Sequence, residues 1–90
     1  MAEVFVVHIT QIDDCVELRN DVRLFSKEED AKNYAKEFIK DERNELSQNI
    51  EDGYWIESDD FEKSWSWECY EDGAYCENHT EVSVTKEEVY

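Results

Sequence analysis

Three side chains near the C-terminal end of the chain are of types that bind zinc, namely Cys69, Cys76 and His79. Structural zinc sites usually separate paired ligands by two to four residues, whereas six residues separate these two cysteines. A fourth ligand would have to come from Cys15 or His8, far away in the sequence. Cysteines that face each other in a hairpin more often fill a core. We therefore expect neither a metal ion nor another cofactor.

Nucleophilic catalysis needs a cysteine or serine with a positioned base, and His8 and His79 are the only two histidines. His8 lies in an apolar segment, as structural histidines do, and no spacing pairs either histidine with a nucleophile. General acid–base catalysis by two carboxylates needs a cleft, for which a small domain with one helix has little room. We expect the protein not to be an enzyme and to have no catalytic residues.

Carboxylates, by contrast, are abundant. The 90 residues include 25 Asp and Glu but only nine Lys and Arg, so the net charge is −16. The second half is the more acidic, because residues 41–90 hold sixteen of the acids and three of the bases. Such a field repels nucleic acid and anionic membranes and attracts basic proteins. The expected partner is a basic nucleic-acid-binding protein or nuclease, with no direct binding of nucleic acid or membrane.

Acids between positions 51 and 81 are interspersed with aromatic residues and with a single Lys or Arg, Lys63. On a strand, residues two apart share a face about 6.6 Å from each other, and neighbouring strands lie about 4.8 Å apart. Carboxylates in such rows would imitate duplex DNA, which has one charge per about 3.4 Å of each strand. Tyrosines would add buried anchors, because binding hot spots favour Tyr and Trp. The predicted partner-binding residues are Glu57, Asp59, Asp60, Glu62, Glu68, Tyr70, Glu71, Asp72, Tyr75, Glu77 and Glu81.

Calcium binding and adaptation to high salt would also produce an acidic chain, but the residues fit both less well. An EF-hand calcium loop needs oxygen ligands at alternate positions and a glycine at its sharp turn, and the chain has no D-x-D-x-D-G pattern. Six Lys against three Arg and many bulky aromatic residues argue mildly against adaptation to high salt.

The N-terminal part predicts three strands. Residues 4–9, VFVVHI, are apolar on both alternating faces, as in an interior strand. Asp13-Asp14 has the composition of a turn. Residues 15–19 and 22–25 are expected to form two short strands around a second turn at Asn20-Asp21.

One long helix is predicted over about residues 27–46. Ser26, followed three residues later by Glu29, fits a capping box, and acids fill the first turn. An apolar stripe at helical spacing then runs along one side of the helix. It consists of Ala31, Tyr34, Ala35, Phe38, Ile39 and Leu46.

The acidic half predicts a strand at 54–57, a turn at 58–60 and a longer strand at 61–70. Asp72-Gly73 is a strong signal for a type I′ hairpin turn. A two-residue turn there would pair Glu71 with Ala74, Tyr70 with Tyr75, and Cys69 with Cys76. An apolar face would carry Trp65, Trp67, Cys69, Cys76, Thr80 and Val82, and an acidic face would carry Glu68, Tyr70, Tyr75, Glu77 and Glu81.

These elements predict one acidic α+β domain over residues 1–90. Its sheet would be mostly antiparallel, with five or six strands and one long helix (about 27–46) packed on one face. The chain has no apolar run long enough for a membrane span or a signal-peptide core. Three cysteines are an odd number, unlike a secreted disulfide framework. We expect a cytoplasmic protein.

The profile of a short acidic α/β domain with aromatic residues on its acidic strands resembles phage-encoded proteins that mimic DNA, such as anti-restriction, anti-CRISPR and glycosylase-inhibitor proteins. These groups share physical character rather than a motif, so the resemblance assigns no residues. It implies a non-enzymatic inhibitor that blocks the nucleic-acid-binding surface of a basic defence protein in the host cytoplasm. The profile is also similar to immunity proteins, or antitoxins, against nuclease toxins. A structural homodimeric interaction module is the alternative from another class.

Overall fold

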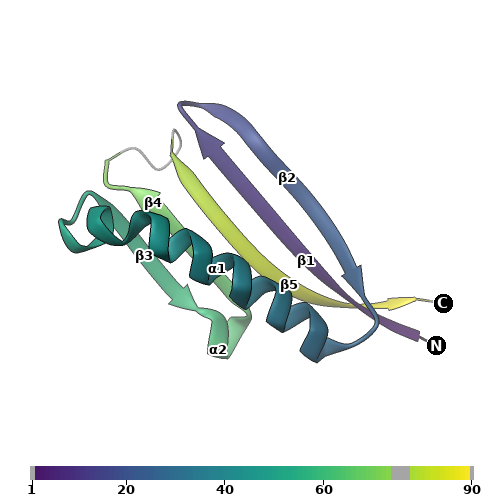
Figure 1. Cartoon of the computed structure of the whole chain (residues 1–90). Coiled ribbons are helices and arrows are strands. Elements are labelled where there is room, and N and C mark those ends of the chain that lie inside the picture. The colour runs from purple at the N-terminus through teal and green to yellow at the C-terminus, as the bar shows by residue number, and fades with distance from the viewer. Residues whose placement is uncertain (1, 74–77, 90) are drawn as a thin grey trace.

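The computed structural model describes residues 2–73 and 78–89, which form a five-stranded antiparallel sheet with a long helix along one face (Figure 1). The strands are β1 (Ala2–Asp13), β2 (Val16–Phe25), β3 (Trp55–Asp60), β4 (Ser66–Glu71) and β5 (His79–Val89); the helices are α1 (Glu28–Glu51) and the short α2 (Phe61–Ser64). The sheet order is β2-β1-β5-β4-β3, so the first and last strands of the chain pair with each other. The predicted α+β class is confirmed.

β1 and β2 form one long hairpin. The chain turns at Asp14 and Cys15, one residue later than predicted, and their φ angles of 52° and 66° suit a two-residue type I′ turn. The predicted turn at Asn20-Asp21 is wrong, because both residues continue β2 in register with β1. The polar Asn20 is accommodated within β2 because its Oδ1 lies 2.6 Å from the ring Nε2 of His8 on the neighbouring strand.

The N-terminus of α1 differs from the predicted capping box. The cap residue is Lys27 rather than Ser26, and no side chain caps the helix. Ala31 N–H donates to the Lys27 carbonyl to close the first turn. Three consecutive acids at the start of α1 take the place of a side-chain cap, because carboxylates there interact favourably with the helix dipole.

α1 also runs five residues beyond its predicted end. Ile50 extends the apolar stripe by one turn and packs against the core. The helix then ends in a Schellman motif, in which Gly53 has a φ of 82°. Gly53 N–H donates to Ile50 O and Tyr54 N–H donates to Asn49 O, which satisfies two of the last carbonyls. Glycine is suited to this position because it adopts positive φ without strain.

The connection between β3 and β4 also differs from the prediction. Residues 58–60 continue β3 opposite β4 instead of forming a turn, and the predicted strand 61–70 begins as α2. Phe61 is buried, and its N–H donates to a carboxylate oxygen of Asp59. The hydroxyl of Ser64 donates to Asp60, and Trp65 ends α2 with a φ of 56°. Two of the acids predicted to bind a partner therefore also stabilise this reversal.

The predicted register of the second hairpin is wrong. Cys69 lies opposite Thr80 and Tyr70 lies opposite His79, so the connecting loop is longer than the two residues Asp72-Gly73. The predicted partners Ala74, Tyr75 and Cys76 lie outside the described residues. The shift for Cys69 is four positions, an even number, so the predicted faces are preserved. Trp67, Cys69, Thr80 and Val82 are buried under α1, whereas Glu68, Tyr70 and Glu81 lie on the opposite side.

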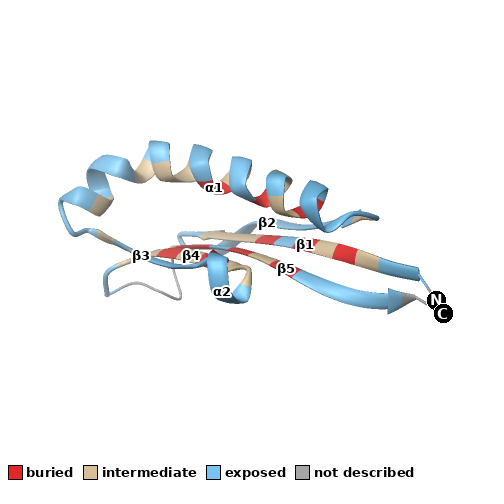
Figure 2. Ribbon diagram, turned by 90° about the horizontal axis from the view of Figure 1, so that it is seen from below, coloured by how far each residue is buried: buried red, intermediate tan, exposed pale blue. Residues whose placement is uncertain are grey.

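The core lies between α1 and the sheet. Figure 2 shows the buried residues on the side of α1 that faces the strands and on the strands beneath it. Trp67 is the largest fully buried side chain, followed by Ile9, Val7, Val82 and Cys69. One layer of helix thus covers one face of the sheet, and the described part of the chain has no comparable layer on the other face.

Candidate functional site

The face of the sheet that α1 does not cover is the candidate site, and we call it the open face. Its members are the strand residues that alternate with the buried ones, and strand pairing places them side by side. They include Val4, Val6, His8, Thr10, Asn20, Val22, Leu24, Ile56, Ser58, Asp60, Ser66, Glu68, Tyr70, His79, Glu81, Ser83, Thr85 and Glu87.

The open face contains four acids, Asp60, Glu68, Glu81 and Glu87, and none of the nine Lys and Arg residues, all of which lie in the described part of the chain. The bases lie on the helices, before α1, or on strand positions that face α1. They are Arg19, Arg23, Lys27, Lys32, Lys36, Lys40, Arg43, Lys63 and Lys86. The two faces of the sheet therefore differ in charge. α1 and the strand side beneath it carry both acids and bases, whereas the strand residues of the open face include acids but no Lys or Arg.

Aromatic rings help to hold the bases on the helix side. The Arg23 guanidinium lies 5.0 Å from the centre of the Tyr34 ring, and Lys32 Nζ lies 4.0 Å from the centre of the Trp65 ring. Cations at these distances are attracted to the negative face of the ring. These contacts favour the separation of the bases from the carboxylates of the open face.

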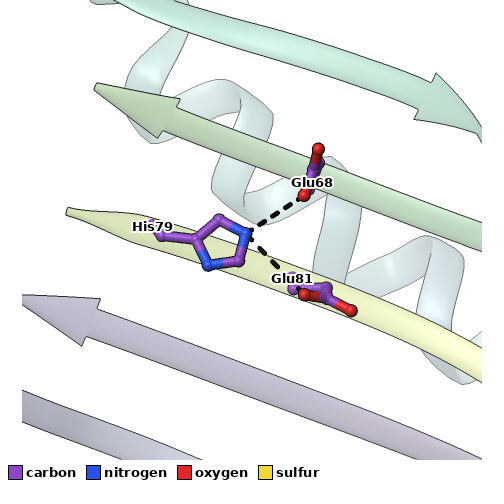
Figure 3. A group of neighbouring side chains, drawn as sticks. All are labelled: Glu68, His79 and Glu81. Atoms are coloured by element: carbon purple, nitrogen blue, oxygen red, sulfur yellow. Dashed lines mark hydrogen bonds and ion pairs between the residues drawn. The ribbon is translucent and has the colours of Figure 1, made fainter. Parts of the chain in front are cut away.

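The centre of the acidic part of the open face is a cluster of Glu68, His79 and Glu81 (Figure 3). Glu68 on β4 lies directly opposite Glu81 on β5, and His79 lies two residues before Glu81. The His79 side chain is only 6% exposed, and its Nε2 lies 3.2 Å from Glu68 Oε2 and 3.8 Å from Glu81 Oε2. The ring thus points one nitrogen at two carboxylates that would otherwise repel each other across the strands.

A hollow of about 260 Å³ adjoins this cluster. It is lined by Ser58, Asp60, Ser66, Trp67, Glu68 and Glu81. Apart from Trp67, these residues belong to the open face, so the hollow is bordered by three carboxylates and two serine hydroxyls. It is a polar depression that can accept a cation or a basic side chain.

Two predicted partner-binding residues face α1 instead. Glu57 and Asp59 lie on the helix side of β3, where Arg43 Nε donates to Glu57 Oε2 at 2.6 Å and Arg43 Nη2 donates to Asp59 Oδ2 at 2.9 Å. Trp67 Nε1 donates to the same Glu57 oxygen at 2.6 Å. Burial alone would lower the pKa of Arg43, but its hydrogen bonds and the two negative charges outweigh burial and raise that pKa. Glu57 and Asp59 therefore lie on the opposite side of the sheet from Glu68 and Glu81, with which they are grouped as predicted partner-binding residues.

Glu71 and Asp72 lie where three turns meet, at the end of the sheet that holds the β1–β2 turn. Asn78 joins these turns: its side-chain Oδ1 accepts the Asp14 N–H at 2.9 Å and its Nδ2 donates to Glu71 at 2.6 Å. Asp72 N–H donates to the carbonyl of Tyr54, just after α1. The acid pairs 13–14, 51–52 and 71–72 are therefore held near one another around Tyr54, which is 66% exposed.

The remaining predicted residues are distributed as follows. Asp60, Glu68, Tyr70 and Glu81 come together on the open face, whereas Glu62 is exposed on α2 and borders a hollow with Lys36 and Arg43 of α1. Tyr75 and Glu77 lie outside the described residues. Sequence reasoning missed His79 in the site and Asn78 at the end of the sheet. His79 stood out only as a zinc ligand, although its even separation from Glu81 places both on one face, and Asn78 carried no signal.

The zinc set suggested by the sequence does not form among the described residues. Cys69 and His79 point to opposite sides of the sheet, since Cys69 is buried beneath α1. Burial, together with the negative charges of Glu57 and Glu42, raises the pKa of the Cys69 thiol to about 11. A protonated thiol is a poor metal ligand and a poor nucleophile, so Cys69 is a core residue.

Comparison with family models, with curated proteins and with solved structures finds no match to this chain. No helix in the described residues is long and apolar enough to cross a membrane.

Proposed function

We propose that the chain is a non-enzymatic acidic inhibitor that uses the open face to block the nucleic-acid-binding surface of a basic protein. One observation carries the proposal: the uncovered face of the sheet presents Asp60, Glu68 and Glu81 around a hollow and has no Lys or Arg among its strand residues. A groove that binds phosphates through Lys and Arg can accept such carboxylates, which pair well with the arginine fork.

The spacing of the acids supports this proposal. Neighbouring strands lie about 4.8 Å apart, so Glu68 and Glu81 present negative charge at intervals of the same order as the phosphates of a nucleic acid strand. We leave Glu57 and Asp59 out of the proposed surface, because both lie on the helix side of β3 and pair with Arg43.

Apolar side chains beside the acids would supply lasting contact. Tyr70 is half-buried, and Ile56, which lies directly opposite it on β3, is 39% exposed. Long-range charge mainly increases the association rate, whereas buried aromatic contacts slow dissociation. An anti-restriction or anti-CRISPR protein of a phage would act in this way, and so would an immunity protein against a nuclease toxin.

The test is capture of a partner at low salt by the tagged chain, followed by release with duplex DNA. The variant Glu68→Lys/Glu81→Lys changes the open face, and Glu37→Lys/Glu45→Lys makes the same change of net charge on exposed positions of α1. We expect the captured protein to bind nucleic acid, to be released by the duplex, and to bind the open-face variant at least about tenfold more weakly. The helix variant should retain it.

Equal loss of binding in both variants would show that only net charge matters and would refute a defined surface. A captured protein that DNA does not displace would refute the proposed mode of inhibition. Circular dichroism of each variant separates loss of binding from loss of folding.

A second candidate, a homodimer, is favoured by a different part of the open face. Val22 and Leu24 on β2 are 60% and 66% exposed and lie beside Val6 on β1. Two such patches could pair with each other. Sedimentation distinguishes the candidates, because apolar pairing holds as salt rises whereas charge-driven binding weakens. A dimer that persists in high salt and dissociates in Leu24→Ser would favour the second candidate.

A further inference from the structure

We propose that Glu68, His79 and Glu81 form a binding site for a divalent transition-metal ion, with Zn²⁺ as the ion that fits best. The three residues offer one imidazole nitrogen and two carboxylate oxygens, all within 4.8 Å of one another. This site shares only His79 with the set of Cys69, Cys76 and His79 suggested by the sequence, and it does not depend on the proposed inhibition.

The distances match the size of a zinc site. Zinc binds imidazole nitrogen and carboxylate oxygen at about 2.0–2.2 Å, so ligands at two corners of a tetrahedron are about 3.3–3.6 Å apart. His79 Nε2 lies 3.2 Å from the Glu68 oxygen and 3.8 Å from the Glu81 oxygen, on either side of that range. Small rotations of the two carboxylates would place all three donors around one ion.

The ligands are held by rigid elements. Glu68 and Glu81 are directly opposed on β4 and β5 in the interior of the sheet, and the His79 side chain is more than nine-tenths buried. Figure 3 shows its Nε2 directed between the two carboxylates. A ligand set positioned by neighbouring strands loses little conformational freedom when it binds an ion.

Electrostatics favour a cation here. Like charges directly opposite each other on neighbouring strands are destabilising, and the open face has no Lys or Arg among its strand residues to offset Glu68 and Glu81. A divalent ion would neutralise both carboxylates at once. Ca²⁺ and Mg²⁺ prefer oxygen ligands alone, so the buried imidazole selects for zinc and similar ions.

There is also room for the rest of the coordination shell. Glu68 and Glu81 border the hollow of about 260 Å³, which is also lined by Asp60 and two serines. A water molecule needs about 30 Å³. With three protein ligands, a water from the hollow would complete a tetrahedral site, and the polar lining would hydrogen-bond that water.

The test is calorimetric titration with ZnCl₂ alone, after treatment with a chelator, in a Cys15→Ser/Cys76→Ser background that removes competing thiols. We expect one ion per chain, which excess Mg²⁺ does not displace. Glu68→Gln and Glu81→Gln keep the side-chain shape but remove the charge, and each should weaken zinc binding at least about tenfold. His8→Gln, which changes the other histidine of the open face, is the matched control and should leave binding unchanged.

Proton NMR of the two imidazole rings provides a readout at the site itself. Zinc should shift the ring signals of His79 and leave those of His8 in place. An unchanged zinc affinity in both glutamate variants would overturn the proposal, as would a stoichiometry that rises with added zinc without saturating. Absence of saturable binding would show instead that the three residues form only an ion pair. None of these results depends on whether the chain binds a basic partner.

Discussion

Arg43 is the residue whose replacement tests the interpretation of the acidic half most directly. It reaches from α1 to two carboxylates of β3, and Glu57, one of them, is only 23% exposed. We expect Arg43→Met to destabilise the fold, because it leaves Glu57 close to the core with only the Trp67 N–H as a partner. If Glu57 and Asp59 instead belonged to a partner-binding array, the same change would affect binding and leave stability nearly unchanged.

The size of the effect follows from the exposure of the groups. Hydrogen bonds to charged groups contribute about 1.5–3 kcal/mol when buried, whereas exposed ion pairs contribute about 0–1 kcal/mol. The Arg43 and Asp59 side chains are 43% and 47% exposed, so we place the total loss at about 1–2 kcal/mol. For a domain of this size, that corresponds to a fall of roughly 5–15 °C in the melting temperature.

Urea denaturation followed by tryptophan fluorescence measures this loss. Lys40→Met makes the same change of charge at an exposed position of α1, one turn earlier, and should alter the free energy of unfolding by less than about 0.5 kcal/mol. In a Glu57→Gln background, Arg43→Met should be less destabilising, because the less exposed of the two carboxylates that pair with Arg43 has gone. Equal losses for the Arg43 and Lys40 variants, or the same loss in both backgrounds, would refute the reasoning.

Three further predictions concern ionisable groups and the net charge. Burial, followed by the charge of Glu45, raises the pKa of Glu42 above 4.5, so its charged form destabilises the fold. Glu42→Gln should therefore raise the melting temperature at pH 7, more than Glu37→Gln does, and this advantage should disappear as the pH falls through the raised pKa towards 4.5. Native protein at pH 8 should alkylate rapidly at exposed Cys15 and not at Cys69, as peptide mass spectrometry can measure; rapid labelling of Cys69 would contradict its burial and its pKa of about 11. Raising the ionic strength from low to physiological values should increase the melting temperature, since the net charge of −16 repels itself, and a decrease would argue against that repulsion.

Much of the fold could be predicted from periodicity. The helix, the α+β class and the two faces of the β4–β5 hairpin follow from apolar spacing, which reflects burial directly. The two faces were predicted correctly even though the register was wrong, because the observed pairing of β4 with β5 differs from the predicted pairing by an even number of residues. Periodicity specifies the side of a strand more strongly than its exact partner.

Turn signals were less informative because polar pairs can be satisfied inside a sheet. Asn20-Asp21 has turn composition, yet the Asn20 side chain contacts His8 on the neighbouring strand and Asp21 forms an ion pair with Arg19. The real turn includes Cys15, whose φ of 66° is unusual for such a residue. The adjacent Asp14 N–H is held by Asn78, a residue 64 positions away that no local rule would identify.

Which acids face α1 and which lie on the open face could not be predicted either, since this depends on a contact between distant residues. Arg43 is 14 positions from Glu57 and 16 from Asp59. Only the packing of α1 over β3 brings them together and removes both acids from the candidate surface. The sequence contains the charges, but the side of β3 that faces α1 decides which of them remain available to a partner.

The two proposals for the open face constrain each other, because they use the same carboxylates. An ion bound by Glu68, His79 and Glu81 would cancel two of the negative charges that a basic partner is proposed to recognise. Binding linkage is reciprocal, so the factor by which zinc weakens the partner's affinity must equal the factor by which the partner weakens zinc binding. If both proposals hold, zinc should lower partner affinity for the native chain and have no effect in a variant that has lost the metal ligands. Independent binding of the two would require the partner to contact acids outside the cluster, such as those at the end of the sheet around Tyr54, where the Glu71 carboxylate accepts a hydrogen bond from Asn78.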